Sequence, residues 1–95
     1  MLAPTGKEIK EALAHKIMGY DAWVWDPINK IEHAMQLVPK MREKGWLFSM
    51  NTVRGDPDYI VEFRYPQEYR AIYANGADEN PARAISLAAY EALCR

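Results

Sequence analysis

The centre of the chain reads Trp46-Leu-Phe-Ser-Met-Asn-Thr-Val53, then Tyr59-Ile-Val-Glu-Phe-Arg-Tyr65, then Tyr69-Arg-Ala-Ile-Tyr-Ala74. All three stretches contain the aromatic and β-branched residues that favour strands. The gaps between them hold turn-forming residues, Gly55–Asp58 and Pro66–Glu68. Short connections between consecutive strands favour an antiparallel meander. We therefore expect a three-stranded antiparallel sheet, with helices before and after it in the chain.

Alternation along these strands predicts two unequal faces of the sheet. The apolar face, expected to pack against helices, carries Trp46, Phe48, Val61, Phe63 and Tyr73. The other face is mixed, and we expect Glu62, Arg64 and Arg70 to lie on it. These three charges are either a cross-strand cluster that solvates the face or part of an anion pocket.

Residues 4–20 are predicted to form the first helix. Thr5 and Glu8 have the spacing of a capping box, and Gly19 is placed to end the helix in a left-handed conformation. Apolar residues recur every fourth position, which predicts one buried stripe. The stripe consists of Ile9, Leu13 and Ile17.

Residues 27–45 are predicted to form a second helix. Its start is either Asp26 before Pro27 or the later capping pair of Asn29 and Glu32. Pro39 lacks a backbone donor, so we expect a kink or a tightened turn before it. The expected buried stripe is Ile31, Ala34, Met35, Val38 and Met41, with Leu37 beside it.

The end of the chain predicts a last helix in the centre of the fold. Asn75-Gly76 is typical of a turn, and Asn80 before Pro81 is a strong helix start. From residue 82 to 92 nearly every residue is small or apolar, which indicates burial on more than one side. Ser86 lies in this stretch, and its hydroxyl is expected to bond back to a carbonyl.

Composition limits the class of protein. The 95 residues are expected to form a single domain, residues 1–95. A formal net charge of −1 provides no basic footprint for nucleic acid or an anionic membrane. Cys94 is the single cysteine, so no disulfide can form within the chain. Because no long apolar run and no signal-peptide core are present, we expect a cytoplasmic protein.

The chain carries no pattern typical of catalysis or metal binding. His15 and His33 fall on different predicted helices, and Asp56 with Asp58 is typical of a solvated turn. Ser49 and Ser86 have no nucleophile context. We therefore expect no catalytic residues, no metal and no cofactor, and the alternative is a hydrolase acting on a nucleotide-like ligand.

One aromatic and basic set is the candidate for ligand binding, because arginine binds phosphate and aromatic rings stack on bases. The set consists of Tyr20, Trp23, Trp25, Arg54, Arg64 and Arg70. The tryptophans in the segment 20–28 either seal an edge of the core or stay exposed as binding anchors.

Five strings in order carry a family resemblance: Lys16-Ile-Met-Gly-Tyr20, Trp25-Asp-Pro27, Ala34-Met-Gln-Leu-Val38, Gly45-Trp-Leu-Phe48 and Ala84-Ile-Ser-Leu-Ala-Ala-Tyr-Glu-Ala92. With them the chain resembles the phage ABA sandwich domain, a group of small bacteriophage and prophage proteins. The resemblance implies an α+β sandwich of the order α-α-β-β-β-α, in which helices pack with the sheet. It also implies a phage or prophage origin, and hence the cytoplasm of the bacterial host.

The resemblance implies little about biochemistry, and Pro39 departs from the uninterrupted helix of the family pattern. We expect a small accessory protein that acts by binding, as an inhibitor of host machinery or host defence. The alternative is a small-molecule binder that sequesters a nucleotide-like signal. The partner is thus a host protein or a nucleotide-like ligand. A homo-dimer or higher homo-oligomer is also expected, because little besides Arg70 and Pro66 blocks pairing at the sheet edges.

Overall fold

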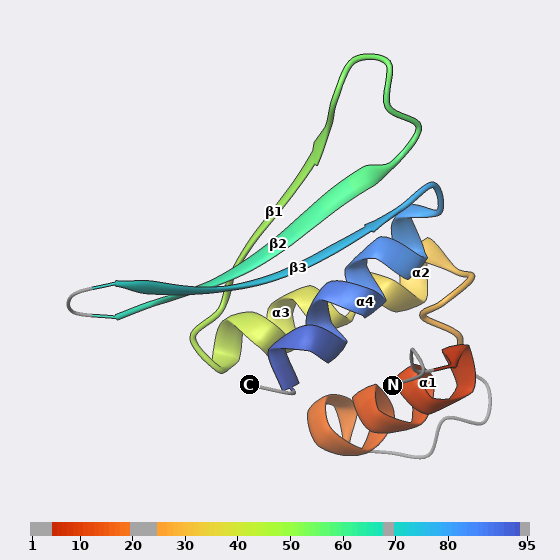
Figure 1. Cartoon of the computed structure of the whole chain (residues 1–95). Helices are drawn as coiled ribbons and strands as arrows, with labels where there is room; N and C mark the ends of the chain where they lie inside the picture. Colours follow the sequence, from red (N-terminus) through yellow and green to blue (C-terminus); the bar gives the residue numbers. More distant parts are fainter. Residues whose placement is uncertain (1–4, 20–24, 68–69, 94–95) are drawn as a thin grey trace.

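The computed structural model describes residues 5–19, 25–67 and 70–93. The chain forms an antiparallel sheet, and the helices pack on one face of it (Figure 1). The expected α+β order is confirmed. The elements are α1 (Gly6–Leu13), a π-helical turn η1 (Ala14–Met18), α2 (Ile31–Ala34), α3 (Leu37–Glu43), β1 (Leu47–Thr52), β2 (Tyr59–Pro66), β3 (Ala71–Asp78) and α4 (Pro81–Leu93).

The sheet has the order β1-β2-β3, as an antiparallel meander requires. Phe63 in the central strand lies opposite Phe48 on one side and Ala74 on the other. Tyr73 lies opposite Arg64, so the prediction that Tyr73 belongs to the helix-facing side is wrong. Opposed residues share a face of a sheet, and on β3 the small Ala74 faces the helices instead.

Asn75-Gly76 is not a turn, which corrects a second prediction. Both residues lie inside β3, which runs on to Asp78. Gly76 is buried beneath α4, and a Cβ built on it would meet the Ala84 carbonyl oxygen and come within 2.6 Å of the Ala88 nitrogen. Glycine is needed here because the backbone of a helix passes close to the strand.

Gly76→Ala is therefore expected to lower the free energy of unfolding by about 1–3 kcal/mol, since α4 must shift to admit the methyl group. The matched control is Ala77→Val at the next, exposed residue, which should change it by less than about 0.5 kcal/mol. Urea unfolding measures both. Equal stability of the two variants would contradict close packing of α4 on Gly76.

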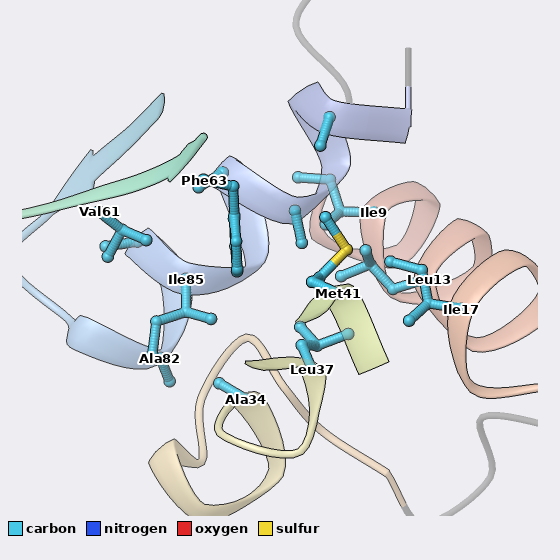
Figure 2. Close-up of a cluster of buried hydrophobic side chains, with 14 of the residues drawn as sticks. Ile9, Leu13, Ile17, Ala34, Leu37, Met41, Val61, Phe63, Ala82 and Ile85 are labelled. Carbon is cyan, nitrogen blue, oxygen red and sulfur yellow. The ribbon is translucent and has the colours of Figure 1, made fainter. Parts of the chain in front are cut away.

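The core forms around α4, as its sequence predicted. One side of α4 packs on β3 and β2, and other sides contact α1, α2 and α3. Figure 2 shows side chains from these elements converging on α4. The fully buried large side chains include Ile9, Leu13, Leu37, Met41, Val61, Phe63 and Ile85.

Phe63→Ala is expected to destabilise the fold by about 3–5 kcal/mol, because it leaves a cavity between the sheet and α4. Phe63 has no exposed surface, and its ring lies 5.5 Å from that of Phe48. Tyr73→Ala removes a ring from the opposite, exposed face and should cost less than about 1 kcal/mol. Chemical denaturation compares the two losses, and similar losses would contradict the assignment of the faces.

The start and end of the first helix agree with the sequence. The Glu8 amide donates to Thr5 Oγ1 at 3.2 Å, and Gly19 ends the segment with φ of 77°. Ile9, Leu13 and Ile17 are buried as the stripe predicted. The last turn is π-helical rather than α-helical, and the Gly19 amide closes it by donating to the Ala14 carbonyl at 2.7 Å.

The second helix divides into α2 and α3, which confirms the tightened turn before Pro39. The Gln36 amide donates to the His33 carbonyl, and the Val38 amide to the Met35 carbonyl, both at 3.2 Å and both three residues back. The break changes which side chains of this segment point into the core. Ile31 and Met35 are therefore exposed, and Leu37 is buried with Ala34 and Met41.

Candidate functional site

No helix in the described part of the chain covers the second face of the sheet, which we call the outer face (Figure 1). The strand registers place its residues. They are Leu47, Ser49, Asn51, Ile60, Glu62, Arg64, Ala71, Tyr73, Asn75 and Ala77. An open face of this kind is common in antiparallel sheets. The mixture of aromatic, aliphatic, amide and charged groups makes it a surface suited to recognition.

One cross-strand row crosses this surface at the start of β1. Leu47 lies opposite Arg64, and Arg64 lies opposite Tyr73. Side chains in such a row are neighbours, with Cβ atoms about 5 Å apart. Leu47 is 41% exposed and Tyr73 is 44% exposed, and Arg64 between them is also exposed. The row therefore presents an aliphatic, a cationic and an aromatic group side by side.

The three predicted charges do not neutralise one another. Glu62 and Arg64 share the outer face, whereas Arg70 precedes β3 and lies in the connection after β2. In residues 5–19, 25–67 and 70–93, the ion pair that forms joins Arg83 and Asp78 at 3.4 Å, beside the start of α4. Within the described ranges neither Glu62 nor Arg64 forms an ion pair, so both can meet charges of a binding partner.

The structure does not gather the predicted ligand-binding residues at one point. Arg54 follows β1 near the Thr52–Tyr59 end of the sheet, and Arg64 lies roughly 17 Å further along β2. Trp25 is buried on the helix side, and its Nε1 donates to the His33 carbonyl at 3.2 Å. Tyr20 and Trp23 lie outside the described residues.

The segment around Trp25 is held by side chains rather than by a regular helix. The Asp26 amide donates to His33 Nδ1 at 2.7 Å, and Asp26 accepts hydrogen bonds from Asn29. Asp26 therefore caps the turn that begins with Pro27. Both predicted starts of the second helix are wrong, because Lys30 is extended and α2 begins at Ile31 with no side-chain cap.

Two bonds from the α4 side anchor this segment in the core. Ser86 Oγ donates to the Pro27 carbonyl at 2.7 Å, and Asn80 Nδ2 donates to the Ile28 carbonyl at 3.1 Å. A carbonyl does accept the Ser86 hydroxyl, but it belongs to a segment 59 residues away and not to the same helix. Asn80 also caps α4 as predicted, because its Oδ1 accepts from the Ala82 amide at 2.9 Å.

A shallow pocket of about 360 Å³ lies between the start of α1 and this segment. Its lining consists of Gly6, Lys7, Lys10, Asp26, Ile28 and Asn29. Partial burial raises the pKa of Asp26. The hydrogen bonds from Asn29 and the charges of Lys10 and Lys30 lower it by more, so the pKa lies below its usual value. The lowered pKa keeps Asp26 a carboxylate at neutral pH, in a pocket that Lys7 and Lys10 also line.

Two further properties concern the described ranges only. No three His, Cys, Asp or Glu side chains there come together in a group that could hold a metal ion. None of the helices there is long and apolar enough to span a bilayer.

These observations define a small α+β domain with its helices on one face of a meander. The family model for the phage ABA sandwich domain matches residues 7–90. The chain belongs to this family, as the resemblance of its sequence motifs implied. Comparison with curated proteins and with solved structures found no match.

Sequence reasoning missed two features of the site. Tyr73 was placed on the wrong face, although the small residues Ala74 and Gly76 at alternate positions could have indicated close contact with the alanine-rich helix. The pocket beside Lys7 and Lys10 has no signal in the sequence, because α1 and the 26–29 segment meet only in the folded chain.

Ser86→Ala tests the anchoring of the 25–29 segment. The variant leaves the buried Pro27 carbonyl without its hydrogen-bond donor, which should lower the free energy of unfolding by about 1–3 kcal/mol. The better helix propensity of alanine offsets about 0.5 kcal/mol of this loss. Ser49→Ala on the outer face is the control and should change stability by less than about 0.5 kcal/mol. Thermal and urea unfolding measure both, and a Ser86→Ala variant as stable as the parent would contradict the anchoring role.

Proposed function

We propose that this phage protein acts by binding a protein of the bacterial host through the outer face of its sheet, without catalysis. One observation carries the proposal. The chain leaves the whole outer face uncovered in its described part, with exposed Leu47, Arg64 and Tyr73 in a single row. Large exposed apolar groups beside polar ones are typical of interaction surfaces.

The composition of this face favours a protein partner. Tyrosine and arginine are enriched among the residues that dominate binding energy at protein interfaces. Ser49, Asn51 and Asn75 surround the row with amide and hydroxyl groups that can bond a partner's polar atoms. Glu62 and Arg64 add one charge of each sign, which gives a partner electrostatic orientation without a strongly basic surface.

The phage origin supports the class of partner that we propose. A phage protein meets host proteins in the infected cell, so components of host machinery or host defence are the partners we propose. This step rests on the family and on analogy rather than on the geometry of the site.

The pocket at Lys7 and Lys10 favours a second candidate function, the sequestration of a nucleotide-like signal. Its volume of about 360 Å³ lies at the lower end of the usual range for small-molecule sites. Two lysines supply charge for a phosphate, whereas Asp26 opposes an anion. Because of this opposing charge, the protein-binding function ranks first.

The experiment is affinity capture from lysate of a bacterial host, with analysis of both proteins and small molecules. The variant Arg64→Ala with Tyr73→Ala should recover a specific host protein at least about tenfold less well than the parent, as expected for interface hot spots. The matched control, Ile31→Ala with Met35→Ala, removes two exposed apolar side chains from the helix side. It should capture the partner as well as the parent does.

The capture also separates the two candidate functions. A recovered nucleotide that is lost with Lys7→Ala and Lys10→Ala, and kept with the outer-face variant, would replace the protein-binding proposal by sequestration. A host protein that is captured equally by the outer-face variant and the control would contradict the outer face as the site.

A further inference from the structure

The free edge of β1 differs from the free edge of β3. Edge strands in monomeric proteins are usually protected by charges, prolines or covering groups. On β3 the outward Asn75 amide donates to Glu91 Oε2 of α4 at 2.8 Å, so that edge is partly covered by the chain itself. β1 pairs with β2 on one side only, and residues 47–52 contain neither a charge nor a proline.

The exposed apolar residues of this edge are spaced symmetrically. Leu47 is 41% exposed, Met50 is 37% exposed and Val53, directly after the strand, is 52% exposed. Leu47 and Val53 each lie three residues from Met50. An antiparallel pair with a twofold axis at Met50 therefore places Leu47 of one copy opposite Val53 of the other, on the outer face, while the two Met50 side chains meet on the helix-facing side.

We propose that β1 pairs with β1 of a second copy of this chain, antiparallel and about a twofold axis at Met50. The pairing joins two three-stranded sheets into one continuous sheet. An axis perpendicular to the sheet keeps each face on its own side, so opposed residues must have the same parity. Placing Met50 opposite Met50 puts Leu47 opposite Val53 and Ser49 opposite Asn51. Both of these pairs satisfy the requirement of equal parity.

The surroundings of the strand fit the same register. Lys44 precedes β1 and Asp56 follows it, at distances of six residues from Met50 on either side. The antiparallel arrangement brings the Lys44 end of one copy toward the turn of the other that carries Arg54 and Asp56, and residues 47–53 between them carry no charge. The Thr52 end of β1 extends past the helices (Figure 1).

The size of the contact sets the expected affinity. A single strand pair with its flanking side chains falls below the roughly 1,200 Å² of standard protein interfaces, which is the range of weak and transient complexes. We therefore expect a dissociation constant in the micromolar range, on the order of 10–100 µM. The inference does not depend on the host partner, because Arg64 and Tyr73 on β2 and β3 stay open in the dimer, which covers only Leu47 of that row.

Sedimentation equilibrium tests the dimer from about 1 µM to about 500 µM, a span that brackets the expected dissociation constant. The mass should rise from 10.9 kDa towards twice that value. A mass that stays at 10.9 kDa throughout would overturn the proposal.

Charge substitutions at the axis test the register. Met50→Glu and Met50→Lys each set like charges against each other, so each alone should weaken the dimer at least about tenfold. An equimolar mixture should restore association, because glutamate then faces lysine across the axis. Circular dichroism verifies that both variants are folded.

Ile31→Glu on the exposed side of α2 is the matched control and should leave the dissociation constant unchanged. Dimers of Met50→Glu as strong as the parent's, or a mixture no stronger than its components, would show that β1 does not pair about Met50.

Discussion

The fold depends on the close approach of α4 to the sheet. Gly76 on β3 and the alanines of α4 have no side chain beyond Cβ, so the two backbones come close enough that a methyl group on Gly76 has no room. Close packing of this kind gains dispersion contacts along the whole element. It also makes α4 the common surface on which α1, α2 and α3 pack, and it explains why α4 is buried on several sides.

The same packing determines where recognition can occur. All helices of the described chain lie on the side of α4, so the opposite face of the sheet is left to solvent. Arg64 and Tyr73 lie on that face because β2 and β3 must turn Phe63 and Ala74 inward. The buried core therefore determines which residues point to the outer face, although the core side chains do not contact the residues of the candidate site.

Much of the fold was predictable because many of its signals are local. Thr5 and Asn80 cap helices with their own side chains, Gly19 ends a helix with a positive φ, and Pro39 lacks a backbone donor wherever it is placed. The candidate site was predictable only in part. Arg64 was correctly placed on the mixed face, but Trp25 and Arg54 lie too far from it to share one small ligand.

Local signals and motif order in the sequence predicted the order of elements, the caps at Thr5, Gly19 and Asn80, the break before Pro39 and the family. Three features became visible only in the folded chain: Asn75-Gly76 continues a strand, Tyr73 faces solvent, and Ser86 donates to the Pro27 carbonyl. Each of these depends on contact with a distant segment. A dipeptide that favours a turn in isolation remains extended when a helix packs directly on it, since the buried contact outweighs the local preference.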